Sequence, residues 1–115
     1  MSVVVRCLYR QGGAKARLHI RDTHVEYMIR HRQLLNTGGA LMADDSQTVT
    51  GMFLVLECED VASAEAFLSE EPYTRAGLFE SRTVEKLDRF VPHQDPEFLE
   101  RLLIMARQWI AKNGR

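Results

Sequence analysis

One histidine lies close to two arginines in the first third of the chain, and this trio could carry acid–base chemistry. Arg17, Arg21 and His24 are spaced by four and three residues, so a helix reaching back to Arg17 would place all three on one face. Histidine is the side chain best suited to moving protons near neutral pH. Arginines beside it suit a substrate with a carboxylate, phenolate or enolate oxygen. The spacing indicates proton transfer on a small anion, although a helix-opening histidine beside arginine is more often a surface or interface residue.

A proton-transferring imidazole needs a carboxylate that fixes its tautomer and stabilises its cation. Asp44 and Asp45 begin a turn between the second and third predicted strands, and either is a candidate for this role. The turn reaches His24 only if the geometry of a barrel or a dimer brings it there. The expected catalytic pair is therefore His24 with Asp45 or Asp44.

The composition argues against several other functions. With 15 Lys+Arg against 16 Asp+Glu, the net charge of −1 gives no support to nucleic-acid or membrane-surface binding. The chain has no HExxH, no cysteine–histidine cluster, no GxGxxG and no Walker A motif, so we expect neither a metal ion nor a cofactor. It shows no signal peptide and no apolar stretch near ~20 residues, and Cys7 and Cys58 fit buried thiols in a reducing compartment. We expect a cytoplasmic protein.

Apolar periodicity and turn signals predict a single α+β domain over residues 1–91. We expect Asp22 or Thr23 to cap the first helix, the pair Gly38-Gly39 to end it, and Asp60 to cap the second helix. The order of elements is the ferredoxin-like one, with an antiparallel sheet and both helices on one face. The predicted elements, in the order β-α-β-β-α-β, span about 3–9, 22–36, 40–42, 51–58, 61–70 and 80–90.

The remaining residues, 92–115, predict a linker and one further helix. Asp95 is its expected cap, Pro96 its first residue, and a wide apolar stripe runs from Phe98 to Ile110. The chain has no other element to cover the second face of the sheet, so we expect a homodimer or a higher homo-oligomer. The helix is then expected to clasp a neighbouring copy. An arm that binds another protein is the alternative.

Five segments stand out in order through about residues 3–91. They are the strand ending at Tyr9, the helix start from Arg17 to Tyr27, Gly38-Gly39-Ala40-Leu41 with its acidic turn, the strand from Gly51 to Glu57, and Glu71-Pro72-Tyr73 with Ala76-Gly77-Leu78-Phe79-Glu80. Together they resemble the YciI-like family of small dimeric α+β barrel proteins. Three positions depart from that family, because Ala40 replaces its usual proline, Ser46 a loop glycine, and Glu71 the aspartate of its Asp-Pro-Tyr motif.

The resemblance implies a ferredoxin-like protomer that pairs its sheet with a second copy. It also implies a pocket that holds a His–Asp dyad, in which His24 is the histidine. Counting from Gly39 favours Asp45 as the aspartate, with Asp44 close behind. Arg17 and Arg21 match basic positions near that pocket.

The hypothesis is a small cofactor-free enzyme of the lyase or isomerase type, acting on a small anionic or aromatic substrate. His24 takes a proton, Asp45 orients it, the two arginines balance charge on the substrate, and Tyr73 is an acid or a pocket wall. The alternatives are a protein of the same fold that binds a small ligand without turnover, and an accessory subunit.

Overall fold

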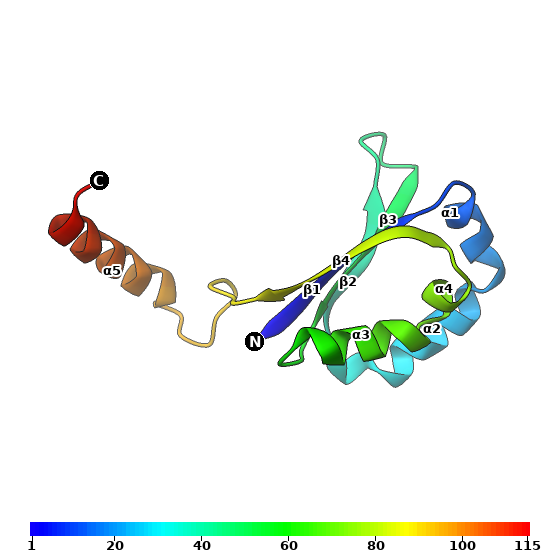
Figure 1. Ribbon diagram of the computed structural model, residues 1–115, viewed down its shortest axis with the longest axis horizontal. Helices are drawn as coiled ribbons and strands as arrows, with labels where there is room; N and C mark the ends of the chain where they lie inside the picture. Colours follow the sequence, from blue (N-terminus) through cyan, green and yellow to red (C-terminus); the bar gives the residue numbers. More distant parts are fainter.

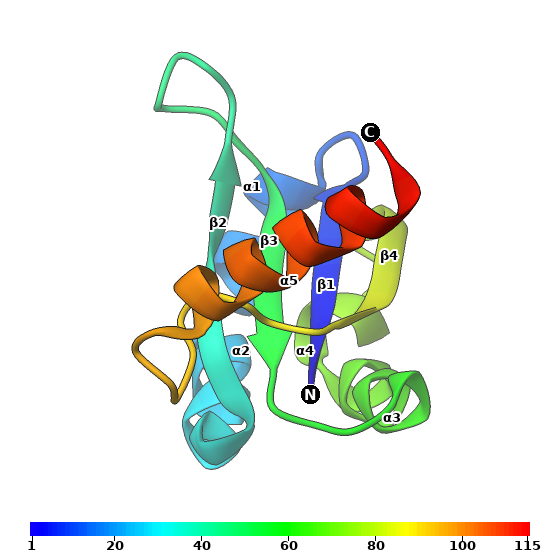
Figure 2. The ribbon, with the colours of Figure 1, turned by 90° about the vertical axis from the view of Figure 1, so that its left-hand side faces the viewer.

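Four antiparallel strands form the sheet on which the site is built (Figure 1). The computed structural model describes all residues, 1–115. The strands lie in the order β2-β3-β1-β4, which Figure 2 shows from left to right. In the centre, Val5 of β1 lies opposite Leu54 of β3 and Val84 of β4. Their bounds are β1 Ser2–Tyr9, β2 Leu35–Met42, β3 Val49–Leu56 and β4 Phe79–Leu87.

The helices of the domain cover one face of this sheet (Figure 1). Tyr27 ties the two longer helices together, because its hydroxyl donates to the carbonyl of Phe67 at 2.7 Å. Alternate residues of β1 and β3 face the helices and form the core: Val3, Val5, Cys7, Met52, Leu54 and Leu56. The predicted ferredoxin-like α+β fold is thus confirmed. The helices and turns are α1 (Gly13–Ala16), the 3₁₀ turn η1 (Arg17–His19), α2 (Arg21–Arg30), the 3₁₀ turn η2 (Arg32–Leu34), α3 (Val61–Glu70) and α4 (Pro72–Arg75).

The second predicted helix has the predicted bounds and the predicted cap. The Asp60 carboxylate accepts the backbone N–H of Ser63 at 2.8 Å, as an N-cap residue does. The helix stops before Pro72, because a proline disfavours helical backbone in the residue that precedes it.

The first predicted helix is too long. α2 ends at Arg30, and the chain is already extended from Leu35, so Gly38 and Gly39 lie inside β2 and are not a helix end. Their backbone pairs with Leu54 and Phe53 of β3, and this pairing determines the conformation of the segment. Asp22 lies within the first turn, and the helix begins after Ile20 without a side-chain cap.

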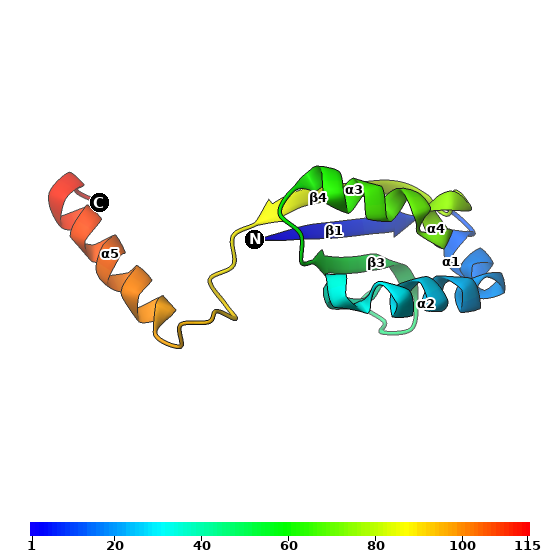
Figure 3. The same ribbon diagram turned by 90° about the horizontal axis from the view of Figure 1, so that it is seen from below.

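The last helix, α5 (Phe98–Asn113), stands apart from the domain (Figures 1 and 3). It begins later than predicted. Asp95 accepts the N–H of Glu97 and pairs with Arg101, so both Asp95 and Pro96 precede the helix. None of its residues is buried, and five of its large apolar side chains are about half exposed or more: Leu99, Leu103, Ile104, Met105 and Trp109. A clasp on a neighbouring copy therefore stays a prediction. None of the helices combines the length and the apolar character that a membrane-spanning segment requires.

Candidate active site

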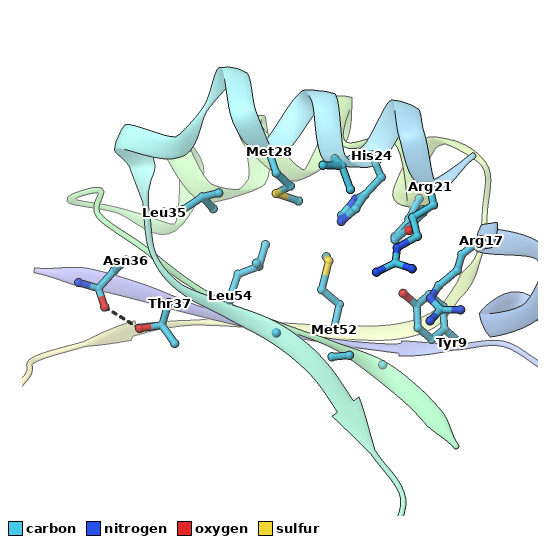
Figure 4. A pocket seen from close by; sticks show the side chains of 16 residues that line it. Tyr9, Arg17, Arg21, His24, Met28, Leu35, Asn36, Thr37, Met52 and Leu54 are labelled. Atoms are coloured by element: carbon cyan, nitrogen blue, oxygen red, sulfur yellow. Dashed lines mark hydrogen bonds between the residues drawn. The ribbon is translucent and has the colours of Figure 1, made fainter. Parts of the chain in front are cut away.

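His24 lies in the first turn of α2, and its ring points from the helix towards the sheet (Figure 4). Its Nδ1 atom is 2.5 Å from Oε1 of Glu71. The His24 side chain is 14% exposed and the Glu71 side chain is fully buried, so the contact is largely shielded from water. A hydrogen bond to a carboxylate is strong in such surroundings.

Glu71 is positioned by the break between α3 and α4. Pro72 is the first residue of α4, and Glu71, immediately before it, is extended and caps the helix. Oε1 accepts the N–H of Tyr73 at 3.0 Å in addition to the imidazole. Oε2 accepts the N–H and the hydroxyl of Thr74, at 3.0 and 3.1 Å. Every oxygen of this buried carboxyl is therefore doubly hydrogen-bonded.

The hydrogen-bond donors around Glu71 keep its carboxyl group ionised. Burial pushes the pKa of Glu71 up, but hydrogen bonds from His24, Tyr73 and Thr74 outweigh burial and bring the pKa below its ordinary value. An ionised carboxylate can only accept hydrogen bonds, so Nδ1 of His24 carries a proton. In the neutral ring Nε2 is then the basic nitrogen, the one that can take a proton from a bound molecule.

Tyr73 packs flat against the imidazole. The two ring centroids are 3.9 Å apart, and the planes differ by 6°. Tyr9 meets Tyr73 edge-on at 6.2 Å, which extends the aromatic wall to β1. Burial raises the pKa of Tyr73, against the opposing effect of Arg17 and Arg21, and burial also raises the pKa of Tyr9 to about 12. Both phenols therefore stay protonated near neutral pH.

A cavity of about 420 Å³ lies between α2 and the β2–β3 part of the sheet (Figure 4). This volume suits a small organic molecule. Gly38 lies in the floor of the cavity with little room for a side chain, because a Cβ atom there would stand 3.0 Å from a methyl carbon of Leu54. The residues that line the cavity are Tyr9, Arg17, Arg21, His24, Val25, Met28, Leu35, Asn36, Thr37, Gly38, Gly39, Ala40, Gly51, Met52, Leu54 and Tyr73.

Arg17 and Arg21 line the same end of the cavity as Tyr9 (Figure 4). Arg17 lies over the Tyr9 ring, with its guanidinium carbon 5.9 Å from the ring centroid, and it donates to the carbonyl of Ala14. The helix does not run unbroken back to Arg17, which belongs to η1, yet both arginines reach the cavity that His24 lines. This end is polar and basic, and the other carries Met28 and Leu35. No group of three His, Cys, Asp or Glu side chains could hold a metal ion.

The predicted partnership of His24 with Asp45 or Asp44 does not exist within the chain. Asp45 lies at the exposed tip of the β2–β3 hairpin, where its carboxylate accepts the N–H groups of Gln47 and Thr48 and the hydroxyl of Thr48. These bonds, that of the Thr48 hydroxyl foremost, lower the pKa of Asp45 to about 2. Neither aspartate lines the cavity. The Asp45 carboxylate is bonded within its own turn, and the carboxylate beside His24 is that of Glu71.

Sequence reasoning missed Glu71 as the partner, although it noted the carboxylate at the end of the second helix. The signal was present in Glu71-Pro72-Tyr73, because a carboxylate before a proline that opens a helix is held at a fixed angle. What the spacing did not reveal is that this helix end lies beside the start of α2, 47 residues earlier in the chain.

Comparison with known proteins agrees with this architecture. A profile of the YCII-related domain matches residues 1–88. The chain belongs to the YCII-related family. The resemblance inferred from the sequence is thereby confirmed, and the match ends before α5 of this YCII-related chain. No curated protein matches it significantly.

A solved structure with the same fold is that of 5-chloro-2-hydroxyhydroquinone dehydrochlorinase (TftG) from Burkholderia phenoliruptrix AC1100, in complex with 2,5-dihydroxybenzoquinone. It is 26% identical to the YCII-related chain, with a TM-score of 0.69. The alignment covers 77% of this chain and 95% of that one.

Proposed function

We propose that this chain is a small enzyme of the lyase or isomerase type that moves a proton on an anionic or aromatic substrate. The observation that carries the proposal is the buried His24–Glu71 pair at the wall of a cavity of about 420 Å³. The pair has the arrangement of a general base, with a carboxylate that fixes one ring nitrogen and leaves the other free.

In the proposed step a substrate proton passes to Nε2 of His24. The ring becomes an imidazolium, and the Glu71 carboxylate stabilises its positive charge across the 2.5 Å contact. The electron pair left on the substrate develops negative charge on an oxygen, which Arg21 and Arg17 balance from the basic end of the cavity. No redox change is involved, so no electron acceptor is needed.

The relative supports this reading through its chemistry. A dehydrochlorination removes a proton and a chloride from one molecule, which is an elimination that a general base promotes. The relative is a dehydrochlorinase and its structure holds a dihydroxyquinone, a small ring with acidic oxygens. We propose a ligand of the same chemical kind here, because its oxygens match the two arginines and its ring matches Met28 and Leu54.

Removal of one arginine tests the ligand class. With 2,5-dihydroxybenzoquinone as the probe, we expect Arg21→Ala to weaken binding about tenfold or more, because a charge-assisted hydrogen bond is lost. Calorimetric titration at two salt concentrations measures this. Arg32→Ala is the matched control, since Arg32 is exposed and outside the cavity. Equal affinity of the wild type, Arg21→Ala and Arg32→Ala for the probe would contradict a role of Arg21 in binding an anionic ligand. Binding by the wild type without turnover of any chlorinated hydroquinone would favour a ligand-binding protein instead.

We also propose that the chain forms a homodimer through the sheet face that carries no helices. Val4, Leu8, Phe53 and Val55 point to this face, since they alternate with the core residues of β1 and β3. Such a face is commonly buried by a second layer. We expect Phe53→Glu to halve the mass in solution measured by light scattering. Ile29→Glu, on the exposed side of α2, should leave the mass unchanged. A wild type of monomeric mass would rule the dimer out.

A further inference from the structure

Thr74 is the least expected member of the group around His24. It lies in α4, does not line the cavity, and is three residues beyond Glu71. Its hydroxyl donates to Oε2 of Glu71 at 3.1 Å, and its N–H donates to the same atom at 3.0 Å. The second oxygen of Glu71 therefore has both of its hydrogen bonds from one residue.

Those two bonds fix the plane of the carboxyl group. A carboxyl group attached to a flexible side chain rotates freely unless both oxygens are held. In the structure Oε1 points at His24 Nδ1 while Oε2 lies beside Thr74. On the other side, Tyr73 supplies an N–H to Oε1 and a ring stacked on the imidazole.

We propose that Thr74 is a positioning residue whose hydroxyl holds the carboxyl plane of Glu71 so that Oε1 stays aligned with His24 Nδ1. Thr74 does not line the cavity, and its side-chain hydrogen bond goes to Glu71, so it acts through Glu71. An effect of Thr74 on turnover rests on the proposed function. Its effect on the geometry of Glu71 can be tested without a substrate.

Other titratable groups face Glu71 and influence its pKa, so all of them are kept in the variants that are compared. They are His24 and Tyr27 on α2, Tyr73 on α4, and Cys7 and Tyr9 on β1. Burial, with a smaller contribution from Glu71, raises the pKa of Cys7 to about 11, and both Cys7 and Tyr9 stay neutral in acid. His24 is present in every variant below.

The test compares the full chain with Thr74→Val, which removes the hydroxyl but keeps the shape. Carbon-13 NMR of the Glu71 carboxyl carbon is followed against pH, together with the proton signal of the His24 Nδ1–H group. We expect Thr74→Val to increase the proton affinity of Glu71 about tenfold or more, because a hydrogen bond to a charged group is lost. The Nδ1–H signal should also exchange faster with water.

Two variants separate the hydroxyl from the bulk of the side chain. Thr74→Ser restores the hydroxyl and should titrate as the wild type does. Thr74→Ala removes the hydroxyl with less bulk and should behave as Thr74→Val does, which also covers the case in which valine disturbs the helix. Thr48→Val is the matched control, because the Thr48 hydroxyl donates to a carboxylate too, at the exposed hairpin. It should leave Glu71 unchanged.

Three results would overturn the proposal. They are a wild-type titration in both Thr74→Val and Thr74→Ala, a failure of Thr74→Ser to restore it, and the same shift in Thr48→Val. None of these measurements uses a substrate, so they stay distinct from a failure of the proposed function. That failure would show as a His24 variant with undiminished turnover.

Discussion

His24→Ala is expected to lower kcat by roughly 10²–10⁴-fold, the usual contribution of a positioned general base. The loss should fall on kcat and not on the affinity for 2,5-dihydroxybenzoquinone, because Arg17 and Arg21 remain in the cavity. Release of chloride from 5-chloro-2-hydroxyhydroquinone is the first reaction to assay, since the structural relative carries that name.

Two variants provide controls for this loss. His19→Ala removes an exposed histidine outside the cavity, and Asp45→Ala removes the hairpin carboxylate that makes bonds only within its own turn. Both should keep the wild-type rate within about twofold, because neither residue touches the reacting atoms. Turnover by His24→Ala at the wild-type rate would remove the general base from the mechanism.

Glu71→Ala is expected to lower the free energy of unfolding by about 3–5 kcal/mol, because several buried donors lose their shared acceptor at about 1–3 kcal/mol each. The variant leaves the N–H groups of Tyr73 and Thr74 and the imidazole without their acceptor. Urea unfolding measures the loss. Glu65→Ala is the matched control, because Glu65 pairs with Arg82 at a 40% exposed position and should cost less than about 1 kcal/mol. Equal losses in the two variants would show that burial of Glu71 is not what matters.

The pH dependence of stability follows from the lowered pKa of Glu71. A carboxyl group whose pKa is lower in the folded than in the unfolded chain stabilises the fold above the unfolded pKa, which is about 4.5 for glutamate. That stabilisation disappears as the pH falls through the folded pKa. Glu71→Gln cannot titrate, so the wild type should be the more stable protein near neutral pH. The difference should shrink in acid. A difference that stays constant with pH would contradict an ionised Glu71.

Local patterns predicted much of the fold. The alternation in β1 and the Asp60 cap before α3 are short-range signals, and both structures form as predicted. The segment from residue 31 to 39 was not predictable, because Leu34 and Leu35 fit a helix as well as a strand, whereas residues 40–42 form a strand as predicted. Only the pairing of Gly38 with Leu54, far along the chain, determines the outcome.

The candidate site likewise contains residues that the sequence predicts and one that it does not. His24, Arg17 and Arg21 were identifiable from their residue types and spacing, and Tyr73 from the motif shared with the family. All four line one cavity. The carboxylate was not identifiable, because proximity of α4 to α2 is a property of the folded domain. The partner of His24 was instead predicted in the acidic turn at Asp44 and Asp45. In such a turn the carboxylate accepts hydrogen bonds from N–H groups of the turn itself, as Asp45 does.

The floor and the acid–base pair of the cavity belong to different parts of the fold. Gly38 and Ala40 come from β2, an edge strand, whereas His24 and Glu71 come from α2 and the start of α4. Mutations that enlarge side chains on this strand would change which molecules fit, while the groups proposed to move the proton stay in place. The size of molecule that the cavity accepts can therefore be changed on β2 separately from the chemistry proposed for His24 and Glu71.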